Sequence, residues 1–409
     1  MKILLINNFH YRKGGSETVY FNTAEILQKR GHEVIFFSRE NPKNLPCRQA
    51  EYFIRSSEST SYFRRMLNYF YNKEARHNIE KLILQEKPDI AHVHLFWGGI
   101  SPSIFGILRK YKIPLIHTAH DYRMVCPAYV FNSNGRICEE CQGVHFYKCA
   151  LKRCSKKNLV ESVLMSAEMY ERNRFLNPAR NLSGVIYVSR FSREKHKQYM
   201  PLLSSIPSIV LYNFANEPSA DLLNHFSRDY YLFYGRLSSE KGVDKLIEVF
   251  ASLPDISLKI VGTGPLEEQL KQTVVRRRIT NVEFLGYKIG RELQTIVSRA
   301  SFVLVPSQCY ENNPMTIIEA YSLQKPVIGA NLGGIPEIID DGKTGYIFQH
   351  DNPEDLHRII KKTINMSEAD YLRMAQNSYE FFKNNFSSEN YAVKLEEFYN
   401  QIKDSYENI

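Results

Sequence analysis

Two short segments in the second half of the sequence carry side chains suited to binding a diphosphate. The first, residues 235–242, contains Arg236 and Lys241 in a loop bounded by glycines. The guanidinium of Arg offers a planar fork of donors and the ammonium of Lys a point charge, so together they suit a diphosphate. From these residues alone, a solvated loop with no ligand fits equally well.

The second segment, residues 310–320, combines a helix start with two carboxylates. Asn313 suits the N-cap position and Pro314 the first helical position, so the helix N-terminus would offer unpaired N–H groups to an anion. Glu311 precedes this end and Glu319 follows in the second turn, where both could accept hydrogen bonds from sugar hydroxyls. A Glu near a helix start commonly interacts only with the helix dipole. The two glutamates therefore indicate a ligand site only in combination with Arg236 and Lys241 of the first segment.

Glycines mark a third anion-binding candidate near the start of the sequence. Gly14 and Gly15 follow the first apolar run and open a helical pattern, where they let a ligand approach backbone N–H groups closely. Simple turn geometry explains a glycine pair equally well. The dinucleotide fingerprint G-x-G-x-x-G is absent, because Gly262 and Gly264 are followed by Glu267 at the third position. The sequence therefore gives no support to an NAD-binding protein.

Five of the seven cysteines fall between positions 126 and 154. Cys-x-x-Cys followed by a second close pair is typical of a tetrahedral zinc site, with four thiolates at about 2.3 Å. We therefore predict a structural zinc ion held by Cys138, Cys141, Cys149 and Cys154, with Cys126 left over. A group of reduced, buried thiols is the alternative, and a redox pair comes third because the motif lacks a strand-to-helix setting.

Short buried runs that alternate with helical patterns must position these residues. The strand candidates are residues 3–6, 34–37, 90–94, 114–119 and 185–189, and then 232–234, 258–261, 282–285, 302–305 and 326–329. Helical patterns between them, such as 241–252 and 265–276, give the strand–helix–strand order of a parallel sheet. The order restarts after residues 200–230, where prolines and polar residues interrupt both periodicities. The sequence therefore predicts an α/β protein with two doubly wound, Rossmann-like domains that face each other across a ligand-binding cleft.

The composition is that of an ordinary globular protein with a basic balance. A length of 409 residues predicts two domains. Lys and Arg number 53 against 44 Asp and Glu, and the formal charge of +9 favours nucleotides, lipid headgroups or nucleic acid as partners. No apolar run approaches the roughly 20 residues of a spanning helix, and the run at 3–6 is too short for a signal peptide. We therefore expect a cytoplasmic protein.

The combined motifs resemble those of family 4 glycosyltransferases with the GT-B fold. The matching segments are residues 14–17, 235–242, 262–265, Glu311-(seven residues)-Glu319, 325–328 and 333–337. The resemblance spans nearly the whole chain and is most specific between residues 232 and 350. It implies a retaining transfer of a hexosyl-type group from a nucleotide-sugar held between the two domains.

The resemblance also implies a division of labour between domains. Residues 1–210 would form the acceptor-side domain, with a cysteine-rich insertion at 126–154. Residues 211–385 would form the nucleotide-sugar-binding domain. Residues 386–409 would form a C-terminal helix that packs back toward the N-terminal domain.

By the same resemblance, most donor-binding residues come from the second domain. Arg236 and Lys241 would neutralise the leaving diphosphate, and Glu319 would hold the ribose hydroxyls. The distal phosphate would be bound by backbone N–H groups of the segment Asn313, Pro314, Met315 and Thr316, in which Pro314 itself has no N–H to donate. Asn313 stands where an aromatic residue is common in the family. The set of groups that contact the donor sugar therefore differs at this position from the usual set of the family.

The residues implied around the reacting sugar are Glu311, which would contact it, and His120, which would lie near sugar and acceptor. Gly14 and Gly15 would let the loop of the first domain close on the donor, and Ser16 replaces an Ala common there. The leaving phosphate oxygen would help to deprotonate the acceptor, so no side-chain nucleophile is needed. The sequence contains no Asp-x-Asp pair, which is consistent with stabilisation of the leaving charge without a metal.

The partners implied are a UDP- or GDP-sugar and a glycan or lipid-linked acceptor in surface polysaccharide or lipopolysaccharide synthesis. The basic residues Lys148, Lys152, Arg153, Lys156 and Lys157 around the cysteines would favour an anionic membrane, at the inner face of the cytoplasmic membrane, or a diphosphate lipid. A nucleotide-sugar epimerase on the same architecture and a zinc-containing nucleic-acid-binding protein are the alternatives. The second is disfavoured because no nucleic-acid-binding motif is present, so we expect no nucleic-acid partner.

Overall fold

The computed structural model describes residues 1–56, 62–133, 135–155, 158–223 and 227–407, as two compact units. The first unit consists of residues 1–134, 138–212 and 391–409. The second consists of residues 135–137 and 213–390. None of the described helices is both long enough and apolar enough to cross a lipid bilayer.

The first unit is built on a six-stranded sheet in which every strand pair is parallel. The strand order is β2-β1-β3-β4-β7-β8. The bounds are β1 (Lys2–Ile6), β2 (Glu33–Phe37), β3 (Ile90–Val93), β4 (Leu115–Ala119), β7 (Gly184–Tyr187) and β8 (Ser208–Val210). Because helices cover a parallel sheet on both faces, its strands read as continuous apolar runs, and residues 3–6 are completely buried.

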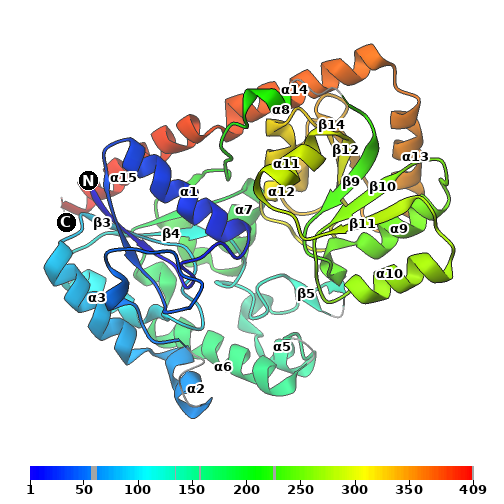
Figure 1. The fold of residues 1–409 in the computed structure, drawn as a ribbon. Coiled ribbons are helices and arrows are strands. Elements are labelled where there is room, and N and C mark those ends of the chain that lie inside the picture. The colour runs from blue at the N-terminus through cyan, green and yellow to red at the C-terminus, as the bar shows by residue number, and fades with distance from the viewer. Residues whose placement is uncertain (57–61, 134, 156–157, 224–226, 408–409) are drawn as a thin grey trace. The chain divides into compact units, whose positions relative to one another are not determined.

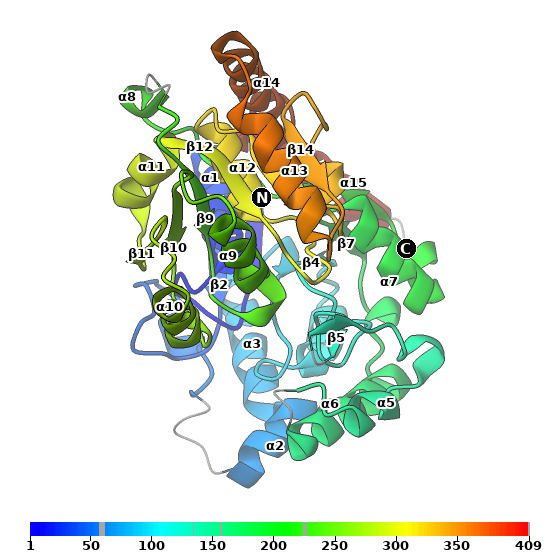
Figure 2. The ribbon, with the colours of Figure 1, turned by 90° about the vertical axis from the view of Figure 1, so that its right-hand side faces the viewer.

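Helices connect these strands and pack around the sheet (Figure 1). They are α1 (Gly15–Lys29), α2 (Tyr62–Phe70), α3 (Lys73–Glu86), α4 (Phe105–Lys110), α5 (Tyr147–Leu151), α6 (Leu159–Phe175) and α7 (Arg190–Tyr199). Two short strands, β5 (Asn132–Ser133) and β6 (Arg136–Ile137), precede α5. Figures 1 and 2 both show α2 alongside one end of α6.

The helix α15 (Ser388–Glu407) joins the first unit from Tyr391 onward. The hydroxyl of Tyr399 lies 2.6 Å from Nδ1 of the fully buried His92 in β3. The hydroxyl of Tyr391 lies 3.1 Å from Oγ1 of Thr23 in α1. Residues far apart in the sequence therefore share one core.

The second unit contains another parallel six-stranded sheet, with the order β11-β10-β9-β12-β13-β14. Its strands are β9 (Tyr230–Tyr234), β10 (Leu258–Val261), β11 (Val282–Gly286), β12 (Ala300–Val305), β13 (Val327–Ala330) and β14 (Gly345–Phe348). Its helices are α8 (Ala220–Leu223), α9 (Val243–Ala251), α10 (Glu267–Arg276), α11 (Gly290–Ser298), α12 (Met315–Ser322), α13 (Pro353–Ile364) and α14 (Glu368–Phe386). This order is the doubly wound Rossmann arrangement, so the fold class predicted from the sequence is confirmed.

Four strands were not expected from the sequence: the two-residue β5 and β6, and one strand of each six-stranded sheet, β8 and β14. β8 has three residues, all half-buried, and it pairs only with β7 at the end of its sheet. β14 likewise ends the second sheet, beside β13. Short edge strands lack the strong apolar run that identifies an inner strand.

Close approach of two loops explains the glycines at 262–264. Gly262 has a φ of +128°, and a Cβ there would lie 1.9 Å from the carbonyl oxygen of Gly235. A Cβ on Gly264 would lie 2.3 Å from the carbonyl oxygen of Leu237. These glycines therefore let the loop after β10 pack against the loop after β9, which carries Arg236 and Lys241.

Candidate active site

The candidate donor site lies at the carboxyl ends of β9 and β12. The strand order of the second sheet reverses between these two neighbours, and in open α/β sheets ligands bind at such a reversal. The loop at 235–242 follows β9, and Glu311 follows β12. The fold therefore brings together the two segments that the sequence analysis selected separately.

Lys241 and Glu311 form an ion pair, with 2.5 Å between Nζ and Oε1. The hydroxyl of Ser307 donates a second hydrogen bond to the same carboxylate at 2.8 Å. The side chains of Lys241 and Glu311 are 31% and 14% exposed. Burial works to raise the pKa of Glu311, but the Lys241 ammonium and Ser307 outweigh it and hold that pKa below its usual value. At neutral pH the pair is therefore a carboxylate and an ammonium.

The backbone of Glu311 is fixed by the turn at 333–334. Gly333 has a φ of +63°, and a Cβ there would lie 2.5 Å from the carbonyl oxygen of Glu311. The N–H of Gly334 donates to that same oxygen at 2.7 Å. The glycines of this segment thus hold the glutamate in place by close packing.

The start of α12 differs by one residue from the prediction. Pro314, with extended backbone, is the N-cap, and the helix begins at Met315. Asn313 does not cap the helix, because its side-chain oxygen accepts from the N–H of Asn213 at 2.7 Å and its carbonyl accepts from the Asn213 amide at 2.9 Å. The first backbone N–H groups of the helix, at Met315 and Thr316, have no partner within it and are suited to an anion.

Glu319 lies in the second turn of α12 beside Tyr234, the last residue of β9. The hydroxyl of Tyr234 donates to the carbonyl of Thr316 at 2.8 Å and also contacts the Glu319 carboxyl group. Burial raises the pKa of Glu319 to about 7, although the hydrogen bond with Tyr234 acts in the opposite direction. Its carboxyl group is therefore partly protonated at neutral pH before any ligand binds.

Arg236 stands apart from this cluster. Its side chain is exposed, and no ion pair or hydrogen bond joins it to another described residue. Lys241, in the same loop, already has Glu311 as its partner. An incoming anion therefore finds one uncommitted guanidinium and one ammonium in an existing pair.

The candidate residues of the first unit follow β1, β3 and β4. Gly14 is the N-cap of α1 and Gly15 its first residue. A Cβ on Gly14 would meet only the Glu17 carboxylate, at 3.6 Å, so packing within the described residues does not require glycine there. The amide of Asn8 donates to the carbonyl of Trp97 at 2.9 Å and joins the loops after β1 and β3.

His120 follows β4, and its Nε2 lies 2.8 Å from Nδ1 of His94. The two ring planes are inclined by only 17°, with 5.1 Å between centroids. Burial lowers the pKa of His120 to about 4, so the imidazole is neutral at neutral pH. A hydrogen bond between two neutral imidazoles needs a donor on one ring and an acceptor on the other, which fixes the tautomer of His120 relative to that of His94.

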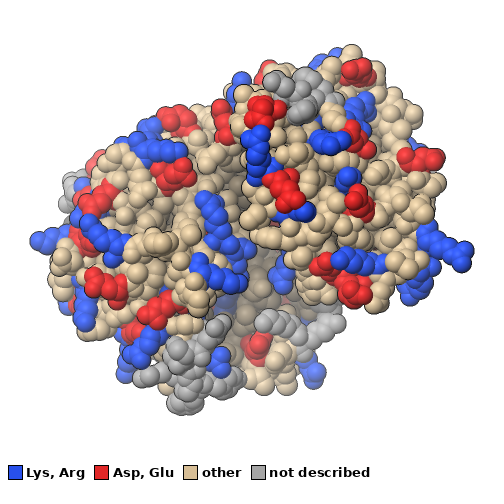
Figure 3. Space-filling model, in the orientation of Figure 1, with Lys and Arg blue, Asp and Glu red and all other residues tan. Residues whose placement is uncertain are grey.

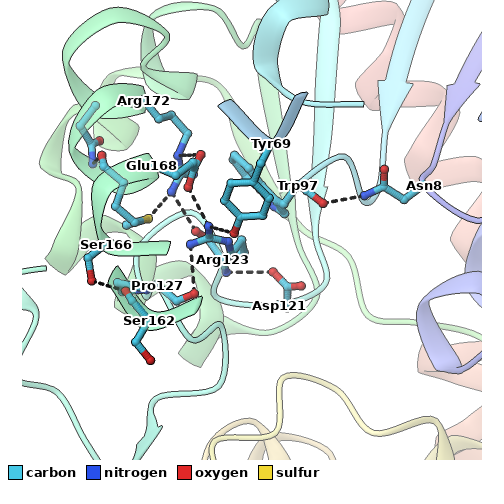
Figure 4. Close-up of polar contacts among 12 residues, drawn as sticks. Asn8, Tyr69, Trp97, Asp121, Arg123, Pro127, Ser162, Ser166, Glu168 and Arg172 are labelled. Carbon is cyan, nitrogen blue, oxygen red and sulfur yellow. Dashed lines mark hydrogen bonds and ion pairs between the residues drawn. The ribbon is translucent and has the colours of Figure 1, made fainter. Parts of the chain in front are cut away.

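A buried ionic network connects the next residue, Asp121, to α6 (Figure 4). The backbone N–H of Arg123 donates to Oδ1 of Asp121 at 2.8 Å. The Arg123 guanidinium donates to Glu168 at 2.7 Å, and Glu168 also lies 3.0 Å from Arg172. The exposed fractions of the three charged side chains are 4%, 4% and 1%. Burial raises the pKa of Asp121 to about 6.

The cysteines at 126–154 share one neighbourhood but do not form a metal site. The thiols of Cys149 and Cys154 are hydrogen-bonded to each other, and Cys154 also bonds Ser133. Nζ of Lys152 lies 3.8 Å from Sγ of Cys138. Across the described part of the chain, no three His, Cys, Asp or Glu side chains are placed to hold a metal ion. The residues as arranged therefore do not fit the predicted zinc ion, which stays a prediction from the spacing of Cys138, Cys141, Cys149 and Cys154.

The structure thus groups the sequence-predicted residues in two sets. One set lies in the second unit and consists of Arg236 and Lys241 on one loop, Glu311, Asn313 to Thr316, and Glu319. Gly14, Gly15 and His120 lie in the first unit. Sequence reasoning missed the supporting partners Tyr234, Ser307, His94 and Asp121. Only Asp121 had a signal, as a carboxylate directly after a predicted buried strand.

Comparisons with known proteins agree with this geometry. The family model for Glycosyltransferase Family 4 matches residues 13–216, and that for Glycosyl transferases group 1 matches residues 220–381. Between them the two models span both units and almost the entire chain. The chain belongs to the family 4 glycosyltransferases with the GT-B fold, as expected from its motifs.

Relatives and solved structures support the same assignment. An uncharacterised glycosyltransferase from Methanocaldococcus jannaschii is 29% identical over 60% of this chain and 67% of its own. An uncharacterised 42.6 kDa protein in the cps region of Klebsiella pneumoniae is 24% identical over 83% of this chain and 87% of its own. The Anabaena protein HepE, solved in complex with UDP and glucose, shares the fold with a TM-score of 0.65 at 16% identity, covering 98% and 100% of the two chains.

Proposed function

We propose that this glycosyltransferase is a retaining, hexosyl-type enzyme that takes its sugar from a UDP- or GDP-sugar. The observation that carries the proposal is the arrangement at the switch point of the second sheet. A cation pair on the loop after β9, unpaired N–H groups at the start of α12 and the carboxyl group of Glu319 lie around the same strand ends. The similarity to HepE, which was solved with UDP and glucose, points to the same ligand class.

Each group has a separate task in this proposal. Arg236 and Lys241 neutralise the diphosphate that leaves, and the N–H groups of Met315 and Thr316 hold its distal phosphate. The Glu319 carboxylate accepts hydrogen bonds from the ribose hydroxyls. Glu311, held as a carboxylate by Lys241, accepts hydrogen bonds from the donor sugar.

In the reaction, the bond from the anomeric carbon to the diphosphate oxygen breaks, and a bond from that carbon to the acceptor oxygen forms on the same face. The acceptor proton passes to the leaving diphosphate, so no side chain needs to act as a nucleophile. The positive groups stabilise the charge that develops on the leaving group. In this proposal the neutral imidazole of His120, whose Nε2 is bonded to His94, lies near the sugar and the acceptor, and no metal takes part in the step.

A thermal-shift panel with UDP, GDP, dTDP, ADP and NAD tests the donor class. A ligand at 100 times its dissociation constant should add about 2.7 kcal/mol to the free energy of unfolding. We expect a shift with one nucleoside diphosphate, its loss in Glu319→Ala, and its retention in Glu354→Ala, which changes an exposed glutamate in the first turn of α13. No shift with any nucleoside diphosphate, or a shift with NAD alone, would contradict the proposal.

We place the enzyme in the synthesis of a surface polysaccharide or lipopolysaccharide, in the cytoplasm and on the inner face of its membrane. The relative in the Klebsiella cps region supports a polysaccharide product. The acceptor is then a glycan or a lipid-linked glycan. Lys156 and Lys157, counted among the basic residues near the cysteines, lie outside the described residues.

The alternative of a nucleic-acid-binding protein gains no support. On the face shown in Figure 3, the Lys and Arg side chains of the described residues are interspersed with Asp and Glu. A protein that follows a nucleic-acid backbone usually presents a continuous basic band. The epimerase alternative likewise has no observation in its favour.

A further inference from the structure

A cavity of about 400 Å³ lies between α2 and α6 in the first unit. Its lining is largely apolar and is supplied by Met66, Tyr69, Gly98, Val160, Leu164 and Met165, with Arg65, Asn158 and Glu161 as its polar members. The Glu161 carboxylate accepts a hydrogen bond from Ser155 at 3.0 Å. A cavity of this size and lining suits part of a hydrocarbon chain.

Exposed hydrophobic side chains are concentrated in the part of the sequence that includes α6, which forms one wall of the cavity. Of the eighteen large hydrophobic side chains that are exposed among the described residues, eight lie between residues 144 and 175. Val160 belongs to both features, because it lines the cavity and is 58% exposed. Exposed apolar groups concentrated in this way mark an interaction site.

Three arginines gather next to the cavity. Arg39, Arg55 and Arg65 line a smaller pocket together with Gly98, and Arg65 and Gly98 also line the cavity. The volume of this pocket is about 30 Å³, which is room for about two water molecules. A larger anion, such as a phosphate group, would therefore sit at the mouth of the pocket. The guanidinium of Arg55 also contacts the carboxylate of Glu74 at 3.2 Å.

Hydrogen bonds connect the cavity to the residues expected near the acceptor. The hydroxyl of Tyr69, in the cavity wall, accepts from the Arg123 guanidinium at 2.7 Å, and the Arg123 N–H donates to Asp121 (Figure 4). Asp121 directly follows His120. Gly98, also in the wall, directly follows Trp97, whose carbonyl is bonded to Asn8. The cavity therefore adjoins the candidate acceptor side of the active site.

We propose that this cavity binds the hydrocarbon chain of a lipid-linked acceptor, with the phosphate of that lipid at the three arginines. The proposal rests on the proposed function, since it names the acceptor class of the same reaction. An amphiphile satisfies both features at once, because the chain leaves water while the phosphate meets guanidinium groups. Inorganic phosphate lacks the chain, and a neutral detergent lacks the charge.

Trp97 makes this testable without turnover, because it is the single tryptophan of the chain and precedes Gly98 in the cavity wall. The probe is dodecyl phosphate, titrated below its micelle concentration while Trp97 fluorescence is followed. We expect saturable binding that is about tenfold or more tighter than that of dodecyl maltoside or inorganic phosphate. Equal binding of the maltoside would overturn the role of the arginines.

Neighbouring residues on α6 provide a matched pair of variants. Leu164 lines the cavity, whereas Val163 is 49% exposed and outside it. Leu164→Asp should weaken binding about tenfold or more, because it places a charge in an apolar cavity, and Val163→Asp should stay within about twofold of the unchanged protein. Arg65→Ala should weaken binding of the phosphate probe, and Arg174→Ala should not.

The outcomes separate the possible failures. Equal binding by Leu164→Asp and the unchanged protein would overturn the proposal, as would a response only to phosphatidylglycerol vesicles, which indicates adsorption to a membrane surface. The UDP thermal shift, measured on the same samples, shows that the variants are folded. A normal UDP response without probe binding rejects the cavity alone, whereas probe binding without any nucleotide response rejects the proposed donor.

Discussion

The ammonium of Lys241 and the carboxylate of Glu311 contact each other at 2.5 Å. The residue expected to meet the diphosphate and the residue expected to meet the sugar therefore neutralise one another beforehand. The carboxylate keeps Ser307 as a second donor. Of the two cations in the loop at 235–242, Lys241 is therefore held in an ion pair, and Arg236 is joined to no other described residue by an ion pair or hydrogen bond.

Removing one charge of this ion pair should lower the free energy of unfolding more than removing both charges. Lys241→Met leaves the carboxylate of Glu311 poorly solvated and without its counter-charge. We therefore expect a loss of about 2 kcal/mol in the free energy of unfolding. This value is below the range for fully buried ion pairs because Lys241 is partly exposed. The double variant Lys241→Met with Glu311→Gln should recover most of this loss. Urea unfolding of the single and double variants measures both values.

Lys245→Met is the matched control, since Lys245 in α9 pairs with the exposed Asp351 in the turn before α13. Its effect should be about 0.5 kcal/mol or less. If the double variant were as unstable as Lys241→Met, the pair would contribute through packing and not through charge.

Binding of UDP should weaken as pH falls, because Glu319 must be ionised to accept hydrogen bonds. The free protein holds the pKa of Glu319 at about 7. A ligand that needs the carboxylate should therefore bind about tenfold more weakly at pH 6 than at pH 8. Calorimetric titration at several pH values checks this, and Glu319→Gln should retain only the shallower dependence due to the diphosphate itself, whose pKa is about 6. A wild-type profile parallel to that of Glu319→Gln would refute the role of the carboxylate.

Asp121 should destabilise the fold at neutral pH. Burial raises its pKa to about 6 from a usual value of 3.8, so the folded protein holds the proton more tightly than the unfolded chain. Stability from this group is present below pH 4 and is lost as pH rises through 6. Asp121→Asn keeps an oxygen for the N–H of Arg123 and should gain about 3 kcal/mol in the free energy of unfolding at pH 7, with almost no gain at pH 3.5. Thermal unfolding at the two pH values tests the difference, and a pH-independent gain would point to packing.

Removing the charge of Glu168 should be among the most damaging changes in the first unit. Glu168→Gln leaves the guanidinium groups of Arg123 and Arg172 buried without a counter-charge, and we expect a loss of about 4 kcal/mol. Glu171→Gln is the control, because burial already raises the pKa of Glu171, so neutralising it should cost little. Chemical denaturation monitored by circular dichroism compares the two. Similar losses of stability in both variants would show that the effect of Glu168→Gln does not come from its ion pairs with Arg123 and Arg172.

The cysteine spacing and the cysteine geometry make opposite predictions about metal. From the spacing we expect one equivalent of zinc per chain, lowered by Cys138→Ser or Cys141→Ser but not by Cys47→Ser, which lies outside the cluster. Elemental analysis of protein purified without chelators gives the content. A metal-free protein in which all seven cysteines titrate as thiols would instead support the hydrogen-bonded cluster seen in the structure.

The inner strands and the motif residues were predictable because their signals are local. Apolar runs identified ten strands, and the glycines at 235 and 242 identified the loop that carries Arg236 and Lys241. Contacts between distant segments had no such signal. Asn313 was predicted to cap α12 from its neighbours alone, but Asn213, 100 residues earlier, occupies its side chain. Tyr234 and Glu319 are likewise 85 residues apart, so only the order of β9 and β12 explains their contact.

The membership of α15 in the first unit has a consequence for how the chain is made. Its Tyr399 completes the surroundings of His92 in β3, yet it is translated after the entire second unit. During synthesis on the ribosome, the core of the first unit therefore stays incomplete until residues 213–390, nearly 180 in number, have emerged. The second unit does not depend on residues that are translated later, so it can complete its fold first. The order of folding should therefore be the reverse of the order of synthesis.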